Sequence, residues 1–125
     1  AIAKAAHAGQ RRRGGEAYIN HPARVASQFD AKSIEASIAY LHDVIEDTDE
    51  TAETLRAKGV DEGVIERVKL LTKQDGRDYR DYLSAVKKDP LARAVKIADM
   101  LDNLCDNPTA KQRDKYRYGI MLLAI

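Results

Sequence analysis

Apolar residues recur at helical spacing along most of this chain. In one clear segment they fall three or four residues apart, at Ile34, Ile38, Leu41 and Ile45. Residues at that spacing share one face of an α-helix, where they can pack against a core. No stretch of four or more residues combines apolar–polar alternation with the β-branched enrichment that is typical of a strand. The pattern therefore predicts an all-α fold.

Residues that start helices divide this pattern into about eight helical segments. Asn20 and Asp61 are predicted N-caps, and Asp89 followed by Pro90 is a strong start signal. The expected helices cover 1–8, 34–45, 51–58 and 78–88, and four more begin near 21, 61, 89 and 109. On the helix that begins near 89, the predicted buried face consists of Leu91, Val95, Ala98 and Leu101.

Length and composition narrow the classes of function. The 125 residues are predicted to form one domain, 1–125, around a single core. Lys and Arg number 21 against 20 Asp and Glu, so no overall field favours nucleic acid or a membrane surface as a partner. The only cysteine, Cys105, cannot form a disulfide within the chain, which fits a reducing, cytoplasmic location. The apolar run 120–125 is far shorter than the ~20 residues of a membrane span. Nothing in these features fixes the oligomeric state.

The segment 42–48, with sequence HDVIEDT, is the richest in candidate chemistry. Two imidazoles and two carboxylates, from His21, His42, Asp43 and Asp99, can close around one divalent cation. Such a mixed donor set suits Mn, Fe or Zn better than Ca or Mg, which prefer oxygen ligands. His21 by itself is better explained as a capping or hydrogen-bonded structural histidine.

The carboxylates of Glu46 and Asp47 lie about one helical turn beyond the His–Asp pair and are acid/base candidates. The alternative is that they belong to a solvated helix end. However, an acidic run at a helix C-terminus opposes the helix dipole, so it requires a compensating cation or a function. We therefore interpret the pair as catalytic.

Two further sets of residues have the chemistry to bind a phosphorylated ligand. Lys96, Asp99 and Asn103 lie at helical positions i, i+3 and i+7, so they share one face. Lys96 can support a ligand carboxylate or contact substrate, and a solvated face would show the same pattern. The basic cluster 11–13 can bind phosphate and stack on a base, although such a triplet is more often a solvated loop.

Five motifs occur in an order that resembles the HD-domain hydrolase of the RelA/SpoT family, in particular its small stand-alone alarmone hydrolases. They are AHAGQ at 6–10, GEAYINHP at 15–22, LHDVIEDT at 41–48, LTK at 71–73 and VKIADMLDNL at 95–104. The resemblance runs from about residue 5 to residue 107 and implies a compact HD-domain bundle of about eight helices. It implies removal of the 3′-pyrophosphate from (p)ppGpp-type nucleotides with one divalent metal ion, and we favour Mn²⁺.

The resemblance also implies a role for each matching residue. The metal ligands would be His21, His42, Asp43 and Asp99, and Glu46 with Asp47 would handle the attacking water. The substrate would contact Arg12, Arg13 and Asn103, with Lys96 as a further candidate. We interpret His7 as structural, although it lies within a matching motif. The roles of Lys73, Tyr79, Arg113 and Tyr116, which could line the far side of a pocket, stay open.

Some positions depart from the family pattern and keep alternatives open. Gly14 replaces a small polar residue, Ala17 a frequent proline, and Met100 a basic residue next to Asp99. These departures bear on which substrate is bound more than on whether the domain is catalytic. The alternatives are an HD-domain hydrolase of another nucleotide, such as an adenine alarmone, a nucleoside monophosphate or a phosphorylated dinucleotide, and a non-catalytic nucleotide sensor. A sensor has no need for the Glu46–Asp47 pair, which argues against it.

Overall fold

The computed structural model describes residues 1–12 and 15–125, and these form an all-α fold. Strands are absent from the described residues apart from an isolated antiparallel bridge between Arg11 and Ala17. The described residues contain nine helices: α1 (Ile2–Ala6), α2 (Asn20–Ala26), α3 (Ile34–Leu41), α4 (Val44–Asp47), α5 (Ala52–Ala57), α6 (Glu62–Leu71), α7 (Tyr79–Lys87), α8 (Pro90–Leu104) and α9 (Ala110–Ala124). The predicted all-α class is confirmed. The extra helix arises because the predicted helix 34–45 is divided in two.

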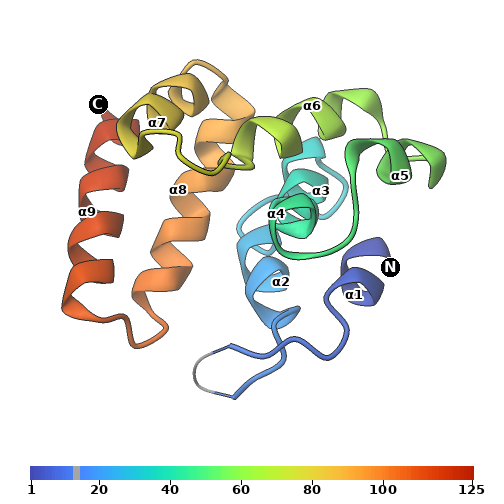
Figure 1. Ribbon diagram of the computed structural model, residues 1–125, viewed down its shortest axis with the longest axis horizontal. Coiled ribbons are helices and arrows are strands. Elements are labelled where there is room, and N and C mark those ends of the chain that lie inside the picture. Colours follow the sequence, from blue (N-terminus) through green and yellow to red (C-terminus); the bar gives the residue numbers. More distant parts are fainter. Residues whose placement is uncertain (13–14) are drawn as a thin grey trace.

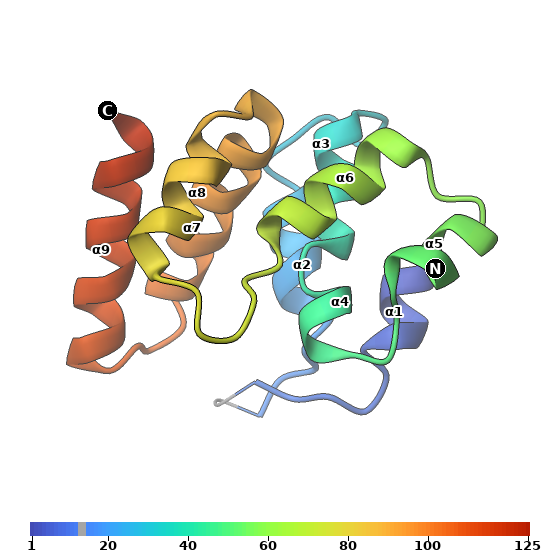
Figure 2. The same ribbon diagram turned by 45° about the horizontal axis from the view of Figure 1, so that its top comes forward.

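Helix α8 is the centre of the arrangement. It packs against α2, α3, α6, α7 and α9, while α1 contacts α3 and α5 contacts α6 at the other side of the molecule (Figures 1 and 2). Helices α8 and α9 run antiparallel as a pair, with α7 lying across one end of them. Residues from both α2 and α3 can therefore meet residues from α8.

Side-chain caps explain where most of the long helices begin. Asp61, Asp78 and Asp89 each accept hydrogen bonds from backbone amides in the first turn of α6, α7 and α8. Thr51 and Thr109 form reciprocal capping boxes at the starts of α5 and α9. These bonds satisfy amides that have no partner within the helix.

The predicted cap at Asn20 is wrong. Asn20 is the first residue of α2, and the residue before it, Ile19, already has helical backbone angles, φ −54° and ψ −25°. The preceding turn supplies carbonyl acceptors, so the amides of Asn20 and His21 bond to Ala17 and Tyr18. No side-chain cap is needed there.

The core lies between α8 and the helices around it. The inner face of α6 consists of four buried residues, Val64, Ile65, Val68 and Leu71. On α8, Val95 and Ala98 are buried as predicted, but Leu101 is 51% exposed and Met100 is fully buried instead. The buried face of α8 is therefore rotated from the predicted one, because α9 covers the side that carries Met100. Among the described residues, no helix combines the length and apolar character needed to cross a membrane.

Candidate metal centre

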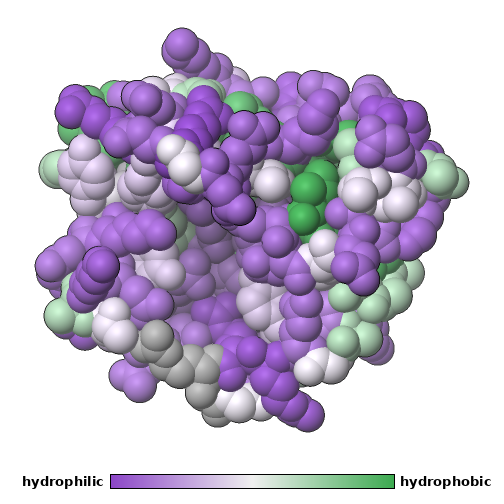
Figure 3. All heavy atoms as spheres, viewed as in Figure 1, coloured by the Kyte–Doolittle hydropathy of each residue, from purple (hydrophilic) through white to green (hydrophobic). Residues whose placement is uncertain are grey.

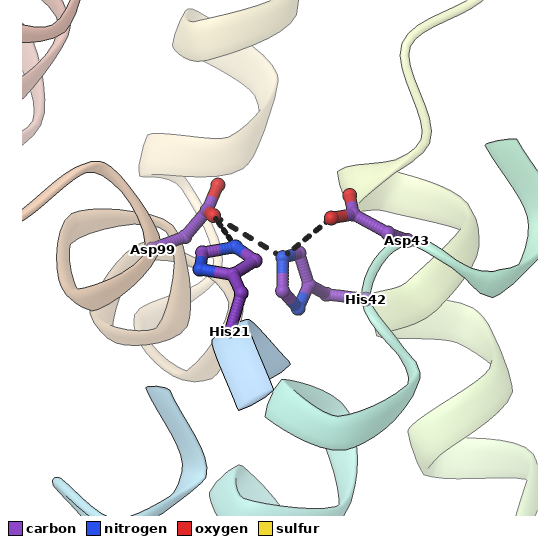
Figure 4. Close-up of side chains that lie close together, drawn as sticks. All are labelled: His21, His42, Asp43 and Asp99. Atoms are coloured by element: carbon purple, nitrogen blue, oxygen red, sulfur yellow. Dashed lines mark hydrogen bonds and ion pairs between the residues drawn. The ribbon is translucent and has the colours of Figure 1, made fainter. Parts of the chain in front are cut away.

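Three separate parts of the chain bring together the four predicted ligand residues. His21 lies in the first turn of α2, His42 and Asp43 lie between α3 and α4, and Asp99 lies on α8. One nitrogen or oxygen from each side chain lies within 4.8 Å of those of the other three. Figure 4 shows all four side chains pointing toward one another.

The junction between α3 and α4 lets two adjacent residues face the same point. Neighbouring residues on a continuous helix point about 100° apart, which would separate His42 from Asp43. Helix α3 instead ends at Leu41, and Asp43 has φ −106° and ψ 0° before α4 begins. His42 Nε2 and Asp43 Oδ2 consequently lie 3.0 Å apart.

The distances between donor atoms fit a single bound cation. Asp99 Oδ1 lies 2.8 Å from His21 Nε2 and 3.2 Å from His42 Nε2. Two ligands bound at about 2.1 Å and at right angles would lie about 3.0 Å apart, so these separations match neighbouring ligands of one ion. Two imidazole nitrogens and two carboxylates form a donor set that suits a divalent transition metal.

Hydrogen bonds on the far side of each imidazole orient these donors. His21 Nδ1 donates to Asp102 Oδ2 at 2.6 Å, and His42 Nδ1 donates to the carbonyl of Ala39 at 2.6 Å. Each ring therefore turns Nε2 toward the cluster, where it can accept a proton or a metal ion. Arg24 holds Asp102 in turn, with its Nε 2.8 Å from Oδ1.

Electrostatics at the cluster are dominated by burial and by the close carboxylates. His21, His42 and Asp99 are all less than 5% exposed. Burial disfavours a charged imidazole, but the charges of Asp43 and Asp99 outweigh it and raise the pKa of His42 well above its usual value. Burial likewise disfavours ionised Asp99, but Lys96 and His42 outweigh it and hold the pKa of that carboxyl well below its usual value. The site therefore favours a positive charge among its carboxylates.

Three residues of the cluster, His21, Asp43 and Asp99, line an open cavity of about 370 Å³. Figure 3 shows a hollow lined with hydrophilic residues in the middle of the face that Figure 1 presents. Its lining combines ligand-type, acidic, basic and aromatic side chains: Arg11, Arg12, Tyr18, His21, Asp43, Glu46, Lys73, Tyr79, Tyr82, Lys96, Asp99, Asn103, Asp106, Lys115 and Tyr116. Arg113 is not among the described residues that line this cavity. The cavity has room and charge for a polar small molecule.

The two candidate acid/base residues differ in position. Glu46 lines the cavity, whereas Asp47 is not among the described residues that do so. Partial burial, together with the negative charges of Asp43 and Asp47, raises the pKa of Glu46. Burial and Asp43 also raise the pKa of Asp47. Glu46 is therefore the carboxylate that can face a bound ligand directly.

The motif at 6–10 supports the backbone of α4. Gln10 Nε2 donates to the carbonyl of Asp47 at 2.9 Å, and His7 Nδ1 donates to Gln10 Oε1 at 2.7 Å. His7 is buried, its ring centroid lies 4.7 Å from that of Tyr18, and its Nε2 has no hydrogen-bond partner among the described residues. His7 lies outside the four-residue cluster, as its structural interpretation predicts.

The candidate substrate-binding residues contact one another and the cluster. Arg12 donates through Nη2 to Asn103 Oδ1 at 2.9 Å and through Nε to Asp106 at 2.7 Å. Asn103 donates in turn to Asp99 Oδ1 at 3.3 Å. Lys96 Nζ lies 3.0 Å from Asp99 Oδ2, and Lys96 also lines the cavity. Its position is therefore compatible with both roles considered above, support of a ligand carboxylate and contact with the substrate. The prediction for Arg13 falls outside the described residues.

Sequence reasoning missed two residues that hold the cluster. No site role was predicted for Tyr18, but its hydroxyl donates to Asp43 Oδ2 and the residue lines the cavity. Asp102 was not singled out, although it binds His21. A signal existed for Asp102, because it lies three residues after Asp99 on the same helix. For Tyr18 the signal was weaker, because its segment is a turn rather than a helix.

Comparisons with known proteins agree with this geometry. No protein-family model matches the chain. The chain is 34% identical over 137 residues to a probable GTP pyrophosphokinase of Mycobacterium leprae, and the match covers 98% of the chain and 17% of that protein. It is 35% identical over 118 residues to a guanosine-3′,5′-bis(diphosphate) 3′-pyrophosphohydrolase of Haemophilus influenzae, covering 82% of the chain and 17% of that protein. The chain thus spans about a sixth of the length of the curated relatives it matches.

A solved structure gives the same result at the level of the fold. It is described as a metazoan ortholog of SpoT that hydrolyses ppGpp, and it superposes with a TM-score of 0.75 at 26% sequence identity. The match covers 98% of the chain and 79% of the solved one.

A helical fold that joins a His–Asp pair to a second histidine and a distant aspartate around one point defines an HD-type domain. Together with the relatives named SpoT or guanosine-3′,5′-bis(diphosphate) 3′-pyrophosphohydrolase, these features identify the family. The chain belongs to the RelA/SpoT family of HD domains.

Proposed function

We propose that this chain is a metal-dependent phosphohydrolase domain that removes the 3′-pyrophosphate from (p)ppGpp-type nucleotides. The observation that carries the proposal is the convergence of four ligand-type side chains, three of which line a polar cavity that Glu46 also lines. The names of the relatives support the substrate class, since several are 3′-pyrophosphohydrolases of guanosine bis(diphosphate).

His21, His42, Asp43 and Asp99 would hold one divalent cation, and the mixed donor set favours Mn²⁺. When bound, the cation would neutralise phosphate charge and lower the pKa of water in the site. Asp102, Ala39 and Tyr18 would keep the ligand side chains oriented through the hydrogen bonds described above.

Glu46 would accept the proton of the attacking water. The water oxygen would form a bond to the phosphorus attached to the 3′-oxygen, and the bond between that phosphorus and the 3′-oxygen would break. The 3′-oxygen would take up a proton, giving a nucleoside 5′-diphosphate or 5′-triphosphate and pyrophosphate. The negative charge of Asp47 would assist by raising the pKa of Glu46, which makes it a better base.

Arg12 and Asn103 would contact the nucleotide at the end of the cavity beside the metal centre. Their mutual hydrogen bond and the bond from Arg12 to Asp106 hold both side chains in place before a ligand binds. A preorganised guanidinium can bind phosphate or stack on a base with little loss of side-chain entropy. Arg13, the next residue in the sequence, would add a second cation.

The test is turnover of a nucleotide panel by the protein with Mn²⁺ and after removal of metal with EDTA. The panel would contain ppGpp, its adenine counterpart, a nucleoside monophosphate and a 2′-phosphorylated dinucleotide. We expect release of pyrophosphate from ppGpp with Mn²⁺ and none after EDTA. Glu46→Gln should lower kcat by about 10²–10⁴-fold with about one Mn²⁺ still bound per chain, because Glu46 is a base and not a ligand.

Glu53→Gln is the matched control, because Glu53 is an exposed carboxylate in the first turn of α5 and should leave turnover unchanged. Faster turnover of another phosphate ester would replace the substrate and keep the hydrolase. Binding of ppGpp without any product would favour a sensor. Wild-type turnover in Glu46→Gln would contradict the assigned base.

A further inference from the structure

The positive charges around the cavity are unevenly compensated. Of the five basic side chains that line it, Arg12 pairs with Asp106 at 2.7 Å and Lys96 pairs with Asp99 at 3.0 Å. Arg11 donates to the backbone carbonyl of Gly15 at 3.1 Å. The remaining two, Lys73 and Lys115, form no ion pair with any described residue.

Lys73, from the α6–α7 loop, and Lys115, from α9, both line the cavity, and we refer to the part of the lining that they form as one corner. Lys115, on α9, places Nζ 4.8 Å from the ring centroid of Tyr79. Tyr79 is the first residue of α7, directly after the loop that carries Lys73. Figure 1 shows that this α6–α7 loop and the loop between α1 and α2, which carries Arg11 and Arg12, lie at different ends of the hollow in Figure 3.

Placing two ammonium groups in one cavity without an ion-pair partner for either costs free energy, because like charges repel and each loses hydration. Burial and the positive charges of Lys96 and Lys73 lower the pKa of Lys115, and together they outweigh the opposing negative charge of Glu46. An anion that entered this corner would reverse both effects. A phosphate group is well suited, because each ammonium can donate several hydrogen bonds to its oxygens.

We propose that Lys73 and Lys115 form a subsite for a second phosphate group of the substrate, the 5′-phosphates of a nucleotide whose 3′-pyrophosphate lies at the metal centre. The inference rests on the proposed function and narrows it. The domain would select nucleotides that carry phosphate on both sides of the sugar. Tyr79 would hold the Lys115 ammonium toward the cavity through its ring face.

The experiment compares two substrates that differ only at the 5′ position. These are guanosine 3′,5′-bis(diphosphate) and guanosine 3′-diphosphate with a free 5′-hydroxyl, assayed with the Mn²⁺-loaded protein. Lys115→Met should lower kcat/KM for the first by about tenfold or more, as expected for loss of a charged hydrogen bond. It should leave the second within about twofold, and Lys115→Arg should retain the preference.

Lys111→Met is the matched control, because Lys111 lies on α9 one turn before Lys115, is exposed and does not line the cavity. It should leave both substrates unchanged. Equal losses for both substrates in Lys115→Met, or no loss for either, would overturn the subsite, while turnover of ppGpp by the wild type would leave the proposed function intact. A circular dichroism melt of each variant excludes misfolding.

If the wild type released pyrophosphate from neither compound, the proposed function would fail and the subsite would be tested by binding alone. Guanosine 5′-diphosphate, titrated calorimetrically into wild type and Lys115→Met, carries only the 5′ group. A dissociation constant raised about tenfold or more by the substitution would support a phosphate subsite. Equal dissociation constants would reject it.

Discussion

At the scale of single residues, the candidate metal centre depends on groups that are not themselves metal ligands but form hydrogen bonds to the ligand residues. Asp102 and the carbonyl of Ala39 fix which nitrogen each histidine turns toward the cluster. The Tyr18 hydroxyl orients the carboxylate of Asp43, a residue at the break between α3 and α4. Hydrogen bonds of this kind strengthen metal binding, because they fix the orientation of the ligand side chains before the metal binds.

Tyr18→Phe should therefore weaken metal binding with little effect on the fold. The substitution removes only the hydroxyl that donates to Asp43 Oδ2 and keeps the ring beside His7 and His21. We expect the Mn²⁺ dissociation constant to rise about 10–100-fold, measured by calorimetric titration. Tyr40→Phe is the control, because Tyr40 is 43% exposed on α3. An unchanged dissociation constant in Tyr18→Phe would mean that the hydroxyl does not orient Asp43.

At the scale of secondary-structure elements, the sequence predicted helices far better than their relation to one another. Asp61, Asp89 and Thr109 begin helices as expected, because a cap is a local hydrogen bond between residues close in the chain. The break after Leu41 was not predicted, because Ile45 continues the apolar spacing of Ile38 and Leu41 across it. The break lets Asp43 lie near Asp99 on α8, and the apolar spacing of one segment carries no information about a residue so distant in the sequence.

The exposed position of Leu101 has a similar cause. Helical spacing identifies a stripe of apolar residues, but which neighbouring stripe is buried depends on the helices that pack against it. On α8 the side facing α9 carries Met100, whereas Leu101 lines a second cavity of about 370 Å³ together with Phe29 and Ile97. A prediction from one helix alone cannot separate these faces.

The close approach of α8 and α9 depends on Gly119. A Cβ at this position would lie 2.7 Å from Met100 Sδ and 3.0 Å from the Tyr79 hydroxyl. Gly119→Val should lower the free energy of unfolding by about 2–4 kcal/mol, because a branched side chain must displace fully buried Met100. Urea unfolding measures this change. Arg117→Val, at an exposed position of the same helix, should lower it by less than about 1 kcal/mol, and equal losses would contradict the packing argument.

At the scale of the whole molecule, the centre joins α2, the α3–α4 junction and α8, which are distant in sequence. The family resemblance predicted which four residues meet, and the structure brings those four together. Neither periodicity nor spacing could have done so, since nothing in residues 21–43 specifies how far away residue 99 lies. The same limit hid the Lys73–Lys115 corner, because its two residues belong to a loop and to α9.

Joining three segments through buried charges should couple metal binding to pH and stability. The pKa of His42 is raised in the folded, metal-free protein above the usual 6.5, although burial opposes this, because Asp43 and Asp99 outweigh it. A group with a raised folded pKa contributes stability that is fully present below its unfolded pKa. That contribution is lost as the pH rises from about 6.5 through the folded pKa.

The melting temperature of EDTA-treated protein should therefore fall as the pH is raised from 6.5 toward 9. Mn²⁺ competes with the proton for His42 Nε2, so the increase in melting temperature on adding Mn²⁺ should be larger at pH 8.5 than at pH 6. At a free metal concentration 100 times the dissociation constant, binding adds about 2.7 kcal/mol to the free energy of unfolding. Calorimetric melts at both pH values measure the effect. Asp99→Asn, which removes a ligand-type charge, should lose most of the increase, and an increase independent of pH would show that Mn²⁺ does not displace a proton from this cluster.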